Sequence, residues 1–127
     1  MFNDVLAARR SLFPANHSNI TIVLVSLGEL KLGQRKYDEA ERLIREALDD
    51  QQKTSPDSWR RYYTESLLGS CLTGSGKYEA AEPLLLSGYK GLVARHASMP
   101  FENRALLNEV RDMLRDLYLK FGKPSPV

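Results

Sequence analysis

Residues 27–44 read LGELKLGQRKYDEAERLI, and residues 68–85 read LGSCLTGSGKYEAAEPLL. The two stretches align without a gap, and every matched pair is 41 residues apart. An ordered set of matches at one offset is the mark of repeated structural units. The sequence therefore predicts an internal repeat, with a first unit over residues 17–55 and a second over residues 56–97.

Each unit has the apolar pattern of two helices. In the first unit, residues 20–32 are dense in apolar side chains, and residues 37–48 then carry one stripe of helical period. The second unit repeats this order over residues 59–72 and 78–92. No stretch shows the sustained alternation of a strand. The prediction is an all-α fold of antiparallel helix pairs, about six helices over a single domain of residues 1–127.

Glycine, proline and serine mark the expected ends of these helices. Gly33 and Gly74 close the first helix of each unit. Ser55 followed by Pro56 offers an N-cap and a proline at the first helical position, which predicts that the next helix begins there. Pro83 falls about a turn into a helix and removes one backbone hydrogen bond, so we expect a kink or a delayed start.

Gly28 and Gly69 occupy the same repeat position inside predicted helices. Glycine there costs about 0.5–1 kcal/mol relative to alanine, so we interpret both as points where a neighbouring helix comes close. The other shared structural positions are an alanine on the opposing helix and a tyrosine that would cover the turn: Ala40, Ala81, Tyr37 and Tyr78.

Both ends of the chain look like incomplete units. Residues 1–16 would be the end of a preceding repeat, since Phe2 stands 42 residues before Ile44. Residues 98–123 would be a C-terminal capping helix, because residues 104–121 carry an amphipathic stripe that Gly122 then stops. Residues 124–127 carry two prolines and are expected to form a disordered tail.

Composition excludes several functional classes. Apolar residues make up 43% and charged residues 27%, which is ordinary for a globular protein. The net charge of +2 gives no reason to expect nucleic acid or a membrane surface as a partner. One cysteine, Cys71, excludes an internal disulfide framework and multi-cysteine zinc sites. We see no signal peptide and no apolar stretch long enough for membrane insertion, and expect a cytoplasmic protein.

No catalytic group of residues stands out. His17 and His96 are the only histidines, and neither has partners at the spacing of a metal site. Residues 74–77 read GSGK, but they lack the preceding strand and the full spacing of a phosphate-binding loop. The sequence therefore predicts a protein that is not an enzyme, with no cofactor and no metal ion.

The order Leu-Gly, turn, Lys-Tyr and Ala-Glu resembles the tetratricopeptide repeat, a helix–turn–helix unit. The long spacing is similar to the 42-residue variant of kinesin light chain. Residues 83–89 resemble repeats found in large bacterial signalling proteins such as serine/threonine kinases. The resemblance implies a right-handed α-α superhelix, in which the first helix of each unit lines a concave face that binds proteins.

On that implied concave face, matched positions fall in three sets: Ile22, Val25 and Glu29, then Tyr63, Ser66 and Ser70, then Glu109, Asp112 and Asp116. The function these positions favour is a non-catalytic module that binds a protein or peptide segment in the groove. The acidic third set would favour a segment carrying Lys or Arg. Family members that grip a peptide backbone or carboxylate have asparagine and basic residues here, and this chain does not, so no ligand identity carries over.

Two alternatives stay open at this point. Some of the apolar groove positions would pack against the next unit instead of meeting a ligand. As an alternative to the peptide-binding module, the chain would be a structural element that forms a homodimer through its exposed end helices, because half-units leave apolar faces uncovered.

Overall fold

The computed structural model describes residues 17–124 and 126. Within them the chain forms α2 (His17–Gly33), α3 (Tyr37–Thr54), α4 (Trp59–Gly74), α5 (Tyr78–Ala94) and α6 (Leu106–Phe121). Two short 3-10 helices, η1 (His96–Ser98) and η2 (Phe101–Asn103), connect α5 to α6. No strand occurs in this part of the chain. The all-α prediction is confirmed.

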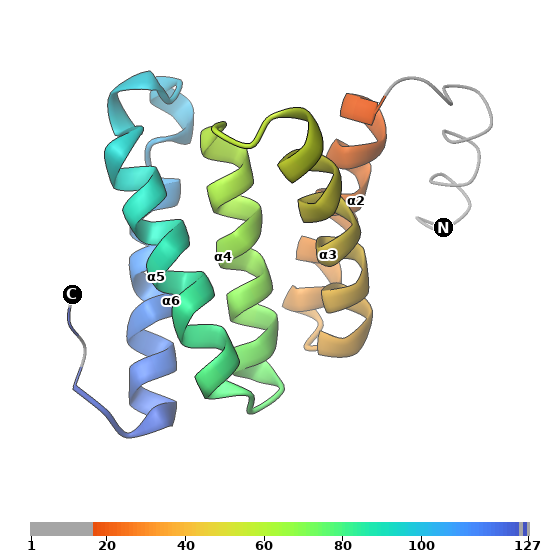
Figure 1. The fold of residues 1–127 in the computed structure, drawn as a ribbon. Coiled ribbons are helices and arrows are strands. Elements are labelled where there is room, and N and C mark those ends of the chain that lie inside the picture. Colours follow the sequence, from red (N-terminus) through yellow and green to blue (C-terminus); the bar gives the residue numbers. More distant parts are fainter. Residues whose placement is uncertain (1–16, 125, 127) are drawn as a thin grey trace.

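Helices that follow one another in sequence pack side by side (Figure 1). α2 and α3 lie at one end, α5 and α6 at the other, and α4 lies between them. α4 contacts α3 and α5 extensively and also touches α2 and α6. Residues 63–69 of α4 are consequently all buried, so α4 is the central helix of the described structure.

Three helices end in the same turn. At the end of α2, α4 and α6, a lysine N–H donates to a carbonyl five residues earlier: Lys36 to Lys31 at 2.9 Å, Lys77 to Leu72 at 2.8 Å and Lys123 to Tyr118 at 3.3 Å. The residue before each lysine is left-handed, with φ of 61° at Arg35, 79° at Gly76 and 76° at Gly122. This is a recurrent helix-ending motif. It aligns α6 with α4 at an offset of 46 residues, as the first helix of a third unit.

Gly28 and Gly69 lie where two helices meet. A Cβ built on Gly28 would lie 2.5 Å from Cγ1 of Ile44 in α3. A Cβ built on Gly69 would lie 2.6 Å from Cγ of Leu85 in α5. Both glycines and both partners are 41 residues apart, and the distances agree with the close helix approach expected. In the 46-residue register the matching residue of α6 is Arg115, whose side chain is exposed.

The two signature tyrosines join one unit to the next. Tyr37, at the start of α3, lies against Gly74 at the end of α4, where a Cβ would come 2.2 Å from the tyrosine ring. Tyr78, at the start of α5, packs on Phe121 at the end of α6 with ring centroids 5.6 Å apart. Each tyrosine thus contacts the following first helix, beyond the turn of its own unit that it was expected to cover.

One predicted helix start is wrong. α4 begins at Trp59 instead of Pro56, because Ser58 is the N-cap and its hydroxyl accepts the N–H of Arg60 at 3.2 Å. Ser55 instead closes a turn, accepting the N–H of Ser58 at 3.1 Å. By contrast, α6 spans Leu106–Phe121 and agrees with the stripe expected over residues 104–121, and residues 98–105, which precede it, form 3-10, turn and bend structure.

Of the two outcomes expected at Pro83, a kink or a delayed start, the delayed start does not occur, since α5 begins at Tyr78 and runs through the proline. Pro83 is exposed, so the carbonyl left without its hydrogen bond is on the wet side of the helix. The expectations for residues 1–16, which include a sixth helix, lie outside the described residues, as do those for residues 125 and 127. No described helix is both long and apolar enough to cross a membrane.

Candidate binding groove

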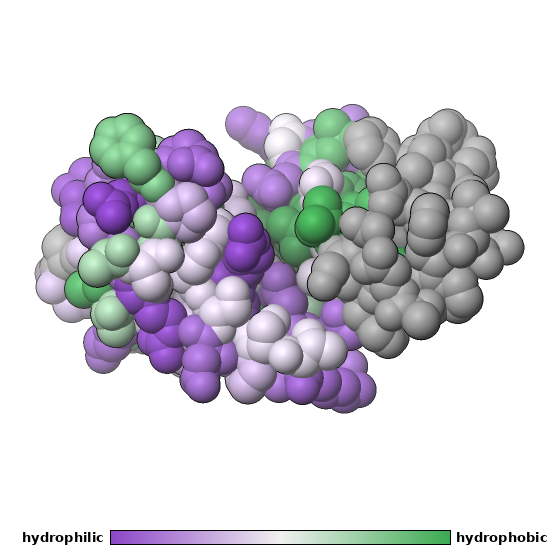
Figure 2. Space-filling model, turned by 90° about the horizontal axis from the view of Figure 1, so that it is seen from above, coloured by the Kyte–Doolittle hydropathy of each residue, from purple (hydrophilic) through white to green (hydrophobic). Residues whose placement is uncertain are grey.

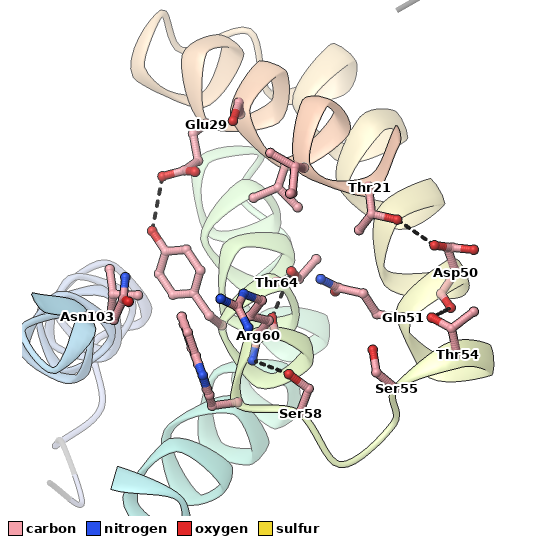
Figure 3. Close-up of a pocket in the computed structure, with 16 residues that line it drawn as sticks. Thr21, Glu29, Asp50, Gln51, Thr54, Ser55, Ser58, Arg60, Thr64 and Asn103 are labelled. Atoms are coloured by element: carbon pink, nitrogen blue, oxygen red, sulfur yellow. Dashed lines mark hydrogen bonds between the residues drawn. The ribbon is translucent and has the colours of Figure 1, made fainter. Parts of the chain in front are cut away.

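An open groove of about 930 Å³ runs between α2, the end of α3 and the first half of α4, and η2 and the start of α6 reach its opposite side. The hollow is visible from above in Figure 2, with apolar surface gathered along one wall. The apolar lining residues are Ile22, Val25, Trp59, Tyr63 and Leu106. All of the remaining lining residues are polar or charged, as the close-up in Figure 3 shows.

Four of the nine groove residues expected from the sequence line this groove: Ile22, Val25, Glu29 and Tyr63. The first three lie on one face of α2, as residues three and four apart in a helix do. Ile22 is 61% exposed, which is high for a large aliphatic side chain. These three residues therefore form the α2 wall of the groove.

Ser66 and Ser70 do not line the groove, which corrects the prediction for the second set. Ser66 is fully buried, and its hydroxyl donates to the carbonyl of Tyr62 at 2.9 Å. It faces α5, where a Cβ on Gly88 would lie 2.0 Å from its Oγ. The physical reason is that α4 has neighbours on both sides, so a position that is open on α2 is filled on α4.

Asp112 and Asp116 also lie outside the groove lining. Both are exposed and pair with basic residues of their own helix, Asp112 with Arg115 at 3.8 Å and Asp116 with Lys120 at 3.0 Å. Of the acidic third set, only Glu109 reaches the groove residues. Glu109 is not a lining residue itself, but its carboxylate contacts the lining residue Tyr63. Fewer acidic side chains therefore reach this end of the groove than predicted.

Tyr63 connects three helices through one hydroxyl group. Its oxygen lies 3.1 Å from Oε2 of Glu29 in α2 and 3.3 Å from Oε2 of Glu109 in α6. The first of these hydrogen bonds is drawn in Figure 3. A phenol has one proton, so it donates to only one carboxylate at a time. Burial, with the two nearby carboxylates, raises the pKa of Tyr63, so the proton stays on the phenol at neutral pH.

The surroundings of Glu29 act on its pKa in opposite directions. Burial of its carboxyl group is the main effect and raises its pKa above the ordinary value of 4.5. The Tyr63 hydrogen bond lowers the pKa, whereas the negative charge of Glu109 raises it again. The charged form of Glu29 is therefore less favourable here than in water.

Gln51 is a groove residue that the sequence interpretation missed. It is only 7% exposed, and its amide group extends from α3 toward the middle of the groove (Figure 3). Its Oε1 atom is buried and has no hydrogen-bond partner among the described residues. One signal was available, because position 51 continues the apolar stripe through Ile44 and Leu48 but holds a polar side chain.

Trp59 and Arg60 form the groove wall at the start of α4. The guanidinium of Arg60 lies 4.6 Å from the centroid of the Trp59 ring, a cation–π arrangement. Opposite them, the hydroxyl of Thr21 in α2 donates to the carboxylate of Asp50 in α3. The groove thus combines an apolar floor with charged and amide groups along its edges, as binding pockets commonly do.

The described residues hold no group of three or more His, Cys, Asp or Glu side chains that could bind a metal ion. Cys71 is buried, and burial raises the pKa of its thiol to about 12, so it is not a thiolate at neutral pH. No protein-family model matches the chain. A search of curated proteins finds no match either.

Proposed function

We propose that the chain is a tetratricopeptide-like interaction module that binds an extended segment of a partner protein in the groove beside α2 and α4. The carrying observation is Ile22, which is 61% exposed and forms part of the groove wall. Covering an apolar side chain in this position with a partner removes it from water, which stabilises the complex. Trp59 and Leu106 are only partly buried and add further apolar area in the same groove.

Repeated contacts support the tetratricopeptide-like part of the proposal. The Gly28–Ile44 and Gly69–Leu85 contacts are equivalent, and the same turn ends α2, α4 and α6. Stacked helix pairs of this kind form extended binding surfaces. The proposal also includes a right-handed superhelix, the absence of catalysis and a place in a larger cytoplasmic signalling protein. These parts rest on the sequence resemblance to the tetratricopeptide repeat.

The groove is favoured over self-association through the C-terminal helix. The outward face of α6 carries Asp112, Arg115, Asp116 and Lys120, which form ion pairs with one another. Burying such a face against a second copy would require the desolvation of these charges, which is costly. Leu119 is the large apolar residue exposed on this helix, at 82%. One exposed leucine among charges is too little apolar surface for a stable dimer.

The test uses the full chain and peptides selected from a random displayed library that lacks tryptophan. Trp59 is the only tryptophan and lies in the groove, so its fluorescence reports occupancy directly. We expect Ile22→Ser to lower the affinity for the selected peptides by roughly tenfold or more, because burial of one aliphatic side chain contributes about 1.5–3 kcal/mol.

Leu119→Ser is the matched control, because it removes an exposed aliphatic side chain outside the groove. Both variants should keep the parent's melting temperature, since exposed substitutions change stability little. Equal affinities for the parent and Ile22→Ser, or the selection of no peptide at all, would contradict the proposed function.

A further inference from the structure

The unpaired amide of Gln51 points to what occupies the groove. Native proteins leave few buried polar atoms without a hydrogen bond, yet Oε1 of Gln51 has no partner in the described part of the chain. The side chain is more than nine-tenths buried and directed into the groove. If the amide turns so that this oxygen faces the groove, a peptide group of a bound segment supplies the missing partner, because an amide can accept a backbone N–H and donate to a backbone C=O.

A second incompletely satisfied group, the carboxylate pair Glu29 and Glu109, lies toward the α6 side of the groove. The hydroxyl of Tyr63 lies 3.1 Å from Glu29 and 3.3 Å from Glu109, but its single proton serves one carboxylate at a time. No basic side chain among the described residues forms an ion pair with either carboxylate. Arg60, the basic residue that lines the groove, stacks on Trp59 instead.

We propose that the groove takes an extended, basic segment of a partner protein: a Lys or Arg side chain of the segment binds between Glu29 and Glu109, and its backbone pairs with Gln51. This inference rests on the proposed function and adds the chemistry of the ligand. Charge complementarity carries it, because one added cation would balance two carboxylates that share a single proton donor. A charge-assisted hydrogen bond at such a partly buried site is stronger than one in water.

The alternative occupant of two carboxylates, a metal ion, is less suited to this geometry. Both carboxylates approach the same phenol oxygen, and no third acidic, cysteine or histidine ligand joins them within the described residues. A flexible lysine or arginine needs no such third ligand, and its multiple N–H groups can reach both carboxylates.

The first experiment measures binding of the full chain to decapeptide pools in which one position is fixed in turn. The pools differ only in the fixed residue, which is Lys, Arg, Glu or norleucine, and Trp59 fluorescence reports binding. We expect the Lys and Arg pools to bind roughly tenfold more tightly than the norleucine pool at one or two positions. This preference should shrink as the salt concentration rises, because screening weakens partly exposed ion pairs.

Variants test whether the two carboxylates cause the preference. The double variant Glu29→Gln, Glu109→Gln keeps the size of both side chains and should bind the Lys and norleucine pools equally. Asp112→Asn is the matched control, because Asp112 is an exposed carboxylate on α6 that pairs with Arg115 of its own helix instead of approaching Tyr63. It should keep the preference for basic pools. A preference that survives in the double variant would overturn the inference.

Gln51→Leu tests the backbone contact and separates it from a structural role. The variant removes a buried polar group that lacks a partner, so its unfolding midpoint should not fall. The affinity for every pool should fall by about fivefold or more, the loss of one hydrogen bond. Gln52→Leu, at the exposed neighbouring position, is the control and should bind as the parent does.

The possible failures are distinguishable. If peptides bind with a dependence on Ile22 but with no preference for Lys or Arg and no effect of salt, the proposed function stands and this inference is wrong. If Gln51→Leu binds every pool as tightly as the parent, the backbone contact is wrong. If no pool binds, both the proposed function and the inference fail.

Discussion

Replacement of Gly69 by alanine should destabilise the protein, although alanine is the better helix former. The added Cβ would lie 2.6 Å from Cγ of Leu85 and 3.3 Å from the carbonyl oxygen of Ala81. Carbon atoms in favourable contact are about 3.5–4.0 Å apart, so α5 must move away or Leu85 must leave its rotamer. Leu85 is fully buried, and close-packed interiors offer few voids into which a side chain can move. Overpacking of this kind costs about 1–3 kcal/mol.

Gly33→Ala is the matched control, because nothing lies within 4 Å of a Cβ built on Gly33. It should gain up to about 1 kcal/mol of helix propensity without a steric cost. Gly69→Ala has the same propensity gain available, so its net loss should be about 0–2 kcal/mol, and the difference between the variants isolates the overpacking. Urea denaturation followed by circular dichroism measures both.

A cycle with Leu85 strengthens this test. Leu85→Ala alone should cost about 2–5 kcal/mol as a cavity, but in the Gly69→Ala background it also relieves the clash. The two substitutions should therefore be less destabilising together than the sum of their separate effects. The close approach of α4 and α5 would be refuted if Gly69→Ala were stabilising to the same extent as Gly33→Ala.

Three further predictions concern other contacts. Tyr118→Phe should lower the free energy of unfolding by about 1.5–3 kcal/mol, because the hydroxyl of the buried Tyr118 donates to Oε2 of Glu82 at 2.7 Å and links α6 to α5; unchanged urea midpoints would contradict this. Because burial raises the folded-state pKa of Glu29, its contribution to stability is favourable below the ordinary value of 4.5 and is lost as the pH rises through the raised pKa. Glu29→Gln should accordingly gain stability relative to the parent from pH 4 to pH 7, and a constant difference across that range would count against the assignment. Deletion of residues 104–127 should expose the faces of α4 and α5 that α6 covers and abolish cooperative thermal unfolding; a truncated chain with a sharp transition would show that α6 is dispensable.

The helix packing could be predicted from the sequence where it depends on local pattern alone. Gly28 and Gly69 indicated close contacts, because glycine inside a helix lowers stability and is expected there only where a neighbouring helix needs the space. Two copies of the same pattern then implied two copies of the same contact. The start of α4 could not be placed in this way, since two serines compete as N-cap and only the path of residues 55–58 decides between them.

Apart from Tyr63 on α4, the groove could be predicted only on its α2 side. Matching α2 to α4 by sequence assumes that equivalent positions have equivalent surroundings, and Ser66 shows that they do not, because it packs against α5. Gln51 lies in the groove because the turn after α3 brings the end of that helix beside the start of α4. Such a contact between different units leaves no regular spacing in the sequence.

Arg115 gives α6 a property that α2 and α4 lack. In those helices the equivalent residue is glycine, and the bare backbone accepts a second helix. On α6 the same place holds a long charged side chain paired with Asp112. A further helix that approached α6 would meet this side chain, so it could not come as close to α6 as α3 and α5 come to α2 and α4. To lengthen this array by protein engineering, one would first have to change residue 115 to glycine.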